Sequence, residues 1–447
     1  MPLNAELESE TSPEVHHQQG WLVWLVKSAL AIFEQALIAG SNFVLNVLVA
    51  RWLTAEQYGA YAVAFACYML LIAFYQGLIL EPMSVLSASF DEERFRSYLG
   101  SLLRVQARIS AILAAVLALV VLGILLFNHN SSLGWTLLAL VPSLPFILVF
   151  WMLRGACYVR RSPHYATQGA FIYSAVMLLG LILVRQWFRI SASTVFIGMG
   201  VSAAAVSCLL YRRLRPNFES KITDWDQWIE HWNFGRWELS KIGFDWVSQN
   251  ISYTLTAGFL GMAQVGALKA IMTLFLPLTQ SMSALRRLLL PHLATISDRS
   301  GHRGAISSVW KMATIYWAGG IVYGILISVA AKPLFHLLYG GKFMEYAYLV
   351  PWAAVAALFG LPGHVIDMGL RAIRSPKSIF ICSCLSAIAC VCVTVPLTWA
   401  FGIRGAVLSI IISSAILLTI LTIIFRKKSR AIVEEATDYD SALIYQK

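Results

Sequence analysis

Apolar runs, each about as long as a membrane-crossing helix, recur along nearly the whole chain, with short polar stretches between them. A helix of roughly 20 apolar residues spans the hydrocarbon core, because every backbone amide there must be bonded within its own segment. The runs number about twelve and are centred near Leu37, Tyr68, Leu113, Val141, Val176, Ala203, Thr254, Leu276, Gly320, Ala356, Ala387 and Ile412. This pattern predicts an all-α, polytopic membrane protein with about 12 transmembrane helices.

The composition supports a bilayer as the solvent of this chain. Hydrophobic residues make up 58% of it and charged residues 13%, with a mean hydropathy of +0.69. Soluble domains carry about 25% charged residues. No stretch between the apolar runs is long enough for a soluble domain, so binding or chemistry must take place within the helices or at their ends.

The basic residues are distributed unevenly between the two sides of the predicted helices. With twelve spans, one side holds 25 of them, and the other side holds only Arg51, Arg185, Arg189, Lys332, Lys342 and Arg404. Because Lys and Arg are retained on the cytoplasmic side, this distribution predicts that both termini are cytoplasmic. The net charge of +11 is therefore explained by orientation, and we expect no nucleic-acid partner.

A polar stretch in the middle of the chain divides the spans into two sets. We predict a disordered cytoplasmic tail over 1–20, six-helix bundles over 21–213 and 239–425, a linker over 214–238, and a cytoplasmic tail with a basic start over 426–447. In the linker, Trp225, Trp228 and Trp232 are spaced i, i+3, i+7. This spacing is typical of an amphipathic helix in the lipid headgroup layer; the alternative is a solvated linker with tryptophan anchors.

The two predicted bundles share a short sequence pattern at one constant offset. The residues Ala50, Leu53, Gln57, Gly59 and Ala60 correspond to Ala257, Leu260, Gln264, Gly266 and Ala267. Two halves with an even number of spans enter the membrane from the same side and are related by an axis along its normal. We therefore predict two pseudo-symmetric bundles with a V-shaped cavity between them.

Polar residues on two repeat-related helices are candidates to line that cavity. Asn42 and Asn46 are one turn apart on the first helix, and Gln249 corresponds to Asn42 at the repeat offset. The alternative is that these amides only form hydrogen bonds between helices.

Cationic residues are candidates to bind an anionic substrate. Arg154 and the repeat-related Arg371 are expected at the cytoplasmic mouth together with Arg286 and Arg287. Guanidinium groups bind phosphate through two parallel hydrogen bonds, although arginines at this depth also anchor helices. Lys269, near the outer end of the eighth helix, could attract a diphosphate or extend outward to water.

Four titratable residues are candidates for ion coupling or gating. They are Glu34, Asp245, His364 and Asp367. Charged groups inside spans are costly and therefore point to function. The alternatives are that Glu34 extends to the cytoplasmic surface and that Asp367 pairs with Arg371.

Several segments of the chain resemble a known transporter family. The stretch from Asn42 to Tyr61 resembles the first two helices of polysaccharide repeat-unit flippases, in the multidrug/oligosaccharidyl-lipid/polysaccharide exporter superfamily. Gly261 to Leu293 resembles the region of its seventh and eighth helices, and Gly402 to Ala406 resembles the start of its last helix. The resemblance covers essentially all twelve spans.

This resemblance implies a flippase acting by alternating access in the bacterial cytoplasmic (inner) membrane. Its substrate would be an undecaprenyl-diphosphate-linked oligosaccharide for O-antigen, lipopolysaccharide or exopolysaccharide. Membrane lipids would surround it, and a polysaccharide polymerase and glycosyltransferases are candidate partners.

The motifs of several other classes are missing. The sequence has no Walker A, GxSxG, HExxH or EF-hand pattern, so we expect no enzymatic activity, cofactor or metal. Two alternatives stay open. A drug or cation antiporter of the same superfamily would use acidic residues in the cavity, and a membrane scaffold for glycosyltransferases would transport nothing.

Overall fold

The computed structural model describes residues 13–87, 89–160, 162–218, 224–372 and 376–445, and every regular element in these ranges is helical. The elements are α1 (Pro13–Trp52), α2 (Ala55–Tyr75), the π-helix η1 (Gln76–Leu80), α3 (Glu81–Leu86), α4 (Glu92–Phe127), α5 (Ser132–Val159), α6 (Pro163–Trp187), α7 (Ala192–Leu214), α8 (Asp224–Leu260), α9 (Met262–Thr273), α10 (Leu276–Val329), α11 (Ala331–Tyr339), the 3-10 helix η2 (Met344–Leu349), α12 (Val350–Ala372) and α13 (Pro376–Tyr445). The prediction of an all-α, polytopic membrane protein is confirmed.

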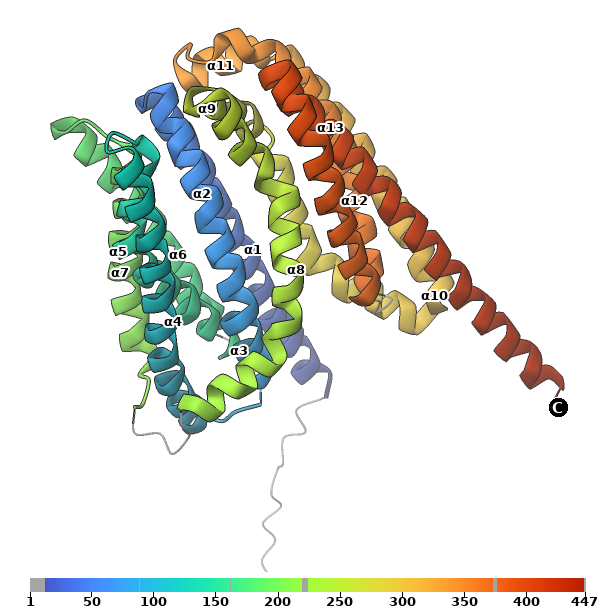
Figure 1. Cartoon of the computed structure of the whole chain (residues 1–447). Coiled ribbons are helices and arrows are strands. Elements are labelled where there is room, and N and C mark those ends of the chain that lie inside the picture. Colours follow the sequence, from blue (N-terminus) through green and yellow to red (C-terminus); the bar gives the residue numbers. More distant parts are fainter. Residues whose placement is uncertain (1–12, 88, 161, 219–223, 373–375, 446–447) are drawn as a thin grey trace, which may run out of the picture.

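The number of spans depends on how bent helices are counted. Nine helices in the described part are long and apolar enough to cross a membrane, and α9 with the start of α10 adds a tenth span that is bent by 57°. One of the nine, α13, bends sharply at Gly402, which has φ 58°, so it contains two helical segments. It rises to the top of Figure 1 and descends again. The nine helices, the bent span, the second segment of α13 and the more polar α8 together account for the predicted set of about twelve.

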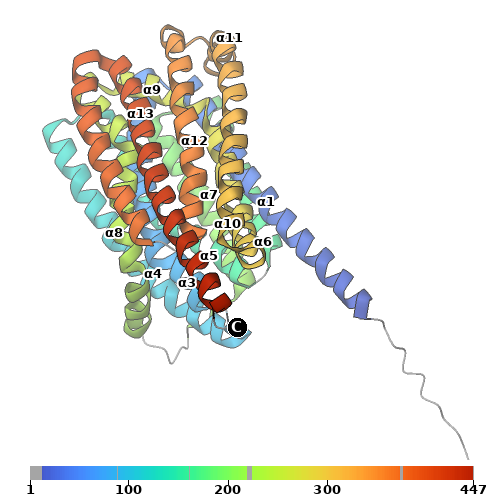
Figure 2. The same ribbon diagram turned by 90° about the vertical axis from the view of Figure 1, so that its right-hand side faces the viewer.

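The helices form two groups that meet at one end. In Figure 1, α1 to α7 stand on one side, and α10, α12 and α13 lean away from them toward the bottom of the view. The groups approach at the top, where α2, α9 and α11 lie. Figure 2 shows α10, α12 and α13 as neighbours in one layer, and they pack on one another. By the charge distribution, the top is the side predicted to face outward, and we call it the outer end.

At the outer end, α2 and α9 cross through two glycines that the repeat offset relates. A Cβ on Gly59 would overlap the carbonyl of Met262, and a Cβ on Gly266 would overlap the carbonyl of Ala55. Ala55 and Met262 are themselves separated by the repeat offset. Each half therefore presents the same surface to the other, as subunits do across a two-fold axis. The predicted pseudo-symmetry is thus realised at this crossing.

Hydrogen bonds strengthen the contact around the crossing. Lys342 Nζ donates to the carbonyls of Arg51 at 2.7 Å and Leu53 at 2.8 Å, next to the end of α1. The last carbonyls of a helix lack partners within it and favour a cation. The hydroxyl groups of Tyr58 and Thr273 are 3.2 Å apart, joining α2 to α9. The outer end is therefore closed by contacts between the two halves.

We expect Gly59→Ala to lower the free energy of unfolding by about 1–3 kcal/mol, the usual range for overpacking. The new methyl group would meet a main-chain carbonyl, which cannot rotate away as a side chain can. Gly258→Ala is the matched control, because a Cβ there meets nothing within 4 Å. The measurement is the thermal unfolding midpoint of the purified protein in detergent.

The double variant Gly59→Ala with Gly266→Ala should cost less than the sum of the single variants, because both changes open the same crossing. Equal midpoints for Gly59→Ala and Gly258→Ala would show that the close crossing does not exist in solution.

Candidate functional site

The candidate site centres on Lys269, a buried cation between the two halves. The residue is 9% exposed. Its ammonium nitrogen lies 5.1 Å from the ring centroid of Phe65 on α2 and 5.6 Å from that of Tyr253 on α8. Among the described residues, no carboxylate pairs with it and no hydrogen-bond acceptor for its ammonium group is found. Two aromatic faces contribute about 0.5–2 kcal/mol each, less than the several kcal/mol that burying an ion costs.

The local sequence explains why Lys269 faces the other half. Gly261 has φ 87° and separates α8 from α9, so α9 starts in a new direction. Gly266 then allows α9 to approach the backbone of α2. Lys269 follows Gly266 by three residues and so projects from the same face of the helix. The side chain is therefore held at the junction of the halves, where an anion could neutralise it.

A second buried charge cluster lies within the first group of helices. Arg154 on α5 donates from Nε to Glu34 Oε1 and from Nη2 to Glu34 Oε2, the latter at 2.9 Å. The Tyr158 hydroxyl donates to the same Oε2 at 2.7 Å. Glu34 is fully buried and Arg154 is 6% exposed. This bidentate pair joins α1 to α5.

The ion pair changes the interpretation of both residues. Arg154, which we predicted to capture an anionic head group at the cytoplasmic mouth, is instead buried and neutralised by Glu34. Glu34, which we predicted to couple or gate, is the other half of the same pair and does not extend to the surface. The sequence could not reveal this pairing, because the two residues are 120 positions apart. The pair holds α1 against α5, and the predicted roles of the two residues in binding and gating stay predictions.

The other predicted acidic residues also have cationic partners. Asp245 is 2.9 Å from Lys241 Nζ and accepts a hydrogen bond of 2.6 Å from Ser383 Oγ on α13. Asp367 accepts from Arg371 Nε at 3.0 Å, which is the ion pair considered as an alternative for these two. Within the described part of the chain, Lys269 is thus the buried charge that lacks an opposite one.

The remaining predicted residues are spread over several surroundings. Asn46 is buried and donates to the carbonyl of Asn42 at 2.8 Å, while its Oδ1 has no partner in the described structure. Gln249 and His364 are exposed. The side chains of Arg286 and Arg287 lie outside those that the structure describes. The predicted lining of the cavity therefore stays a prediction.

One buried residue at the end opposite the outer end was missed from the sequence. His231 lies in the first part of α8, which includes most of the described portion of the predicted linker, and it is fully buried. Its Nδ1 is 3.0 Å from the carbonyl of Leu78 and its Nε2 is 2.7 Å from the hydroxyl of Tyr98. A carbonyl only accepts, so Nδ1 carries the hydrogen and neutral Nε2 accepts from Tyr98. Gln227, one turn earlier, donates to the carbonyl of Tyr98.

These bonds dock the tryptophan-rich segment onto the first group of helices. Trp225 and Trp232 remain exposed, and the Trp232 ring lies 5.9 Å from that of Trp228. The i, i+4 spacing of Gln227 and His231 in the sequence was the one indication that this face is docked. Polar residues at that spacing are also typical of a solvated helix face.

The fold is similar to that of solved membrane transporters. A lipid II flippase, MurJ, in an inward closed conformation aligns with a TM-score of 0.70 at 16% identity, covering 91% of this chain and 90% of that one. An inward-facing multidrug resistance MATE family transporter of the MOP superfamily aligns with a TM-score of 0.70 at 13% identity, covering 90% and 96%. This chain has the same fold as these proteins. No protein-family model matches the sequence, and no curated protein sequence does.

An outward-facing MATE family transporter of the MOP superfamily gives a TM-score of 0.62 at 12% identity, covering 92% of this chain and 96% of that one, lower than the 0.70 of the inward-facing structure.

We expect Glu34→Gln to lower the free energy of unfolding by about 3–5 kcal/mol, because it leaves the Arg154 charge buried without a counter-charge. Replacing both residues, as Glu34→Gln with Arg154→Met, should recover much of that loss. Glu92→Gln is the control, since Glu92 is half-exposed and pairs with Arg96 and Arg160 near the surface, and such pairs contribute about 0–1 kcal/mol each. Equilibrium unfolding in denaturant measures all three. A loss for Glu34→Gln no larger than the control would contradict the structural role.

We expect acidification to release the docked segment. Burial lowers the pKa of His231 below the usual value of about 6.5. Docking is therefore complete above about pH 6.5 and is lost as the pH falls through the lowered pKa. A spin label at Asn233→Cys, in a chain whose seven cysteines are replaced, should become more mobile at low pH.

The control for this experiment is His231→Gln, which can still donate to the Leu78 carbonyl but does not titrate. The mobility of its label should not depend on pH. If the pH response persists in this variant, another group is responsible.

Proposed function

We propose that this chain is a flippase that moves undecaprenyl-diphosphate-linked oligosaccharide repeat units across the bacterial cytoplasmic membrane, by alternating access, for surface polysaccharide biosynthesis. The observation that carries the proposal is the unpaired charge of Lys269 between the two halves. A diphosphate head group supplies the negative charge that this position lacks. The similarity in fold to a lipid II flippase also supports a lipid-linked substrate.

The buried and half-buried charges described above favour an anionic substrate over a cationic one. A cation antiporter needs a free carboxylate in its path, whereas Glu34, Asp245 and Asp367 each have a cationic partner. Removing any of them from its pair would leave a second uncompensated cation. A diphosphate would instead neutralise the charge of Lys269, and none of these ion pairs would have to break.

The rest of the substrate can be assigned by chemistry. Saccharide hydroxyl groups would meet amides such as Gln249 and the Asn46 side chain, whose Oδ1 has no partner among the described residues. The prenyl tail would remain in the lipid. In this proposal both termini are cytoplasmic, and a polymerase and glycosyltransferases are candidate partners on the two sides of the membrane.

We expect Lys269→Gln to reduce translocation at least about tenfold while the thermal unfolding midpoint stays equal or rises. The stability is retained because the change removes a buried charge that has no partner. Lys269→Arg should keep part of the activity, and Lys332→Gln, at an exposed residue of the outer end, should keep all of it. The assay measures lipid-linked oligosaccharide trapped in the inner leaflet and polysaccharide at the cell surface.

Two results would overturn the proposal. Normal surface polysaccharide together with drug export that Asp245→Asn abolishes would establish an antiporter. Normal surface polysaccharide in cells that lack the protein, with glycosyltransferase complexes dissociated, would establish a scaffold.

A further inference from the structure

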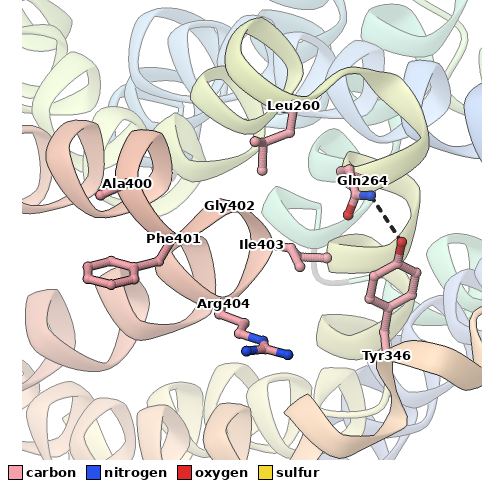
Figure 3. A pocket seen from close by; sticks show the side chains of 8 residues that line it. All are labelled: Leu260, Gln264, Tyr346, Ala400, Phe401, Gly402, Ile403 and Arg404. Atoms are coloured by element: carbon pink, nitrogen blue, oxygen red, sulfur yellow. Dashed lines mark hydrogen bonds between the residues drawn. The ribbon is translucent and has the colours of Figure 1, made fainter.

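A hollow of about 510 Å³ opens at the outer end, separate from the junction that holds Lys269. It is lined by the end of α8, the first turn of α9, η2 and the bend of α13, as Figure 3 shows. Its volume falls within the range of about 300–1,000 Å³ that small-molecule sites occupy. Neither the predicted cavity residues nor the ion pairs described above line it.

Two backbone bends create this hollow. Gly261 between α8 and α9 has φ 87°, and Gly402 within α13 has φ 58°; both values are strained for residues that have a Cβ. The two bends face each other, since the Cβ position of Gly402 is 3.9 Å from the side chain of Leu260. Because the backbone changes direction at each of these glycines, the space between the two bends is left unfilled.

The polar groups of the hollow suit an anion. Arg404 is exposed and its Nε donates to the Tyr348 hydroxyl at 2.9 Å, so both terminal guanidinium nitrogens remain for a ligand. In Figure 3, the Arg404 side chain extends toward the side where Tyr346 lies. Gln264 donates to the Tyr346 hydroxyl at 3.0 Å, and its Oε1, which has no partner in the described structure, can accept from a hydroxyl group of a ligand but does not contribute to binding the phosphate. No carboxylate is part of the lining, although the Glu345 carboxylate interacts with the Tyr346 hydroxyl beside the hollow.

The surroundings place the hollow at the depth of lipid head groups. Trp399 is 75% exposed and Phe401 is 62% exposed, both on the last turn before the bend of α13. Large aromatic side chains that remain exposed at the end of a span are typical of the membrane–water interface. A ligand in the hollow would therefore have its polar part at the interface and its apolar part beside α13, in the hydrocarbon.

We propose that this hollow binds the phosphate of a lipid head group at the outer membrane surface, with the terminal nitrogens of Arg404 on the phosphate oxygens. A phosphate satisfies the fork of an arginine by two parallel hydrogen bonds. The phosphate can belong to a phospholipid of the outer leaflet or to the prenyl diphosphate released after translocation. The second source rests on the function proposed above, whereas the site itself does not.

The test is native mass spectrometry of the full-length protein with three separate probes. Phosphatidylglycerol and undecaprenyl diphosphate carry the phosphate, and diacylglycerol lacks it. We expect the first two to remain bound and diacylglycerol to dissociate. Arg404→Gln should weaken the retention of phosphate-bearing lipid about tenfold or more, and Ala400→Phe should weaken it by filling the hollow without changing the charge. Arg189→Gln, at another exposed arginine of the outer end, is the matched control.

The outcomes separate the two sources and the two proposals. Tighter retention of undecaprenyl diphosphate than of phosphatidylglycerol, lost in Arg404→Gln, supports a site for the translocated product. Equal retention, lost in the same variant, supports a phospholipid site. Retention by Arg404→Gln at the level of Arg189→Gln overturns the site. If cells without the protein export polysaccharide normally, the proposed function fails, while a loss of lipid in Arg404→Gln still supports the site.

Discussion

The close crossing of α2 and α9 is the constraint on which the arrangement of the two halves depends. Helix backbones approach this closely only where side chains are absent, and here each half contributes one glycine, Gly59 or Gly266, to the same contact. Membrane helices gain little from apolar burial against one another, because lipid is equally apolar, so close packing is a main source of association. The crossing fixes the outer end and brings Lys269 against Phe65 of the opposite half.

The charges of the transmembrane region have two different roles. Glu34 and Arg154 satisfy each other through two hydrogen bonds and a tyrosine hydroxyl, and they tie helices of one half together. Lys269 has only aromatic rings beside it. A buried pair of this kind resists change, whereas a lone buried cation is stabilised by any anion that reaches it. This difference separates a structural charge from one that can respond to a substrate.

The sequence predicted the features that depend on local pattern. The apolar runs predicted the helices, and the shared offset of Gly59 and Gly266 predicted the relation between the halves. Lys269 was found because any charge inside an apolar run is conspicuous. The partner of Arg154 could not be found, because helix faces that meet across 120 residues leave no local signal. His231 was missed because a docked polar face and a solvated one have the same spacing. The hollow beside Arg404 arises from two backbone bends that only the folded chain brings together.

The continuity of α8 has a consequence for how the halves can move. This helix has 37 residues, and near its beginning His231 is bonded to Leu78 and Tyr98 of the first half. Further along, Asp245 is bonded to Ser383 of the second half. A rigid rod fastened to two bodies prevents them from rotating against each other. Trp246, the residue after Asp245, donates to the Ala66 carbonyl of the first half, so α8 is fastened to the first half on both sides of Gly243. The angle between the halves can therefore change only if one of these attachments is released. A change of that angle would then begin with the loss of a hydrogen bond along α8 rather than with a movement of the loop between the repeats.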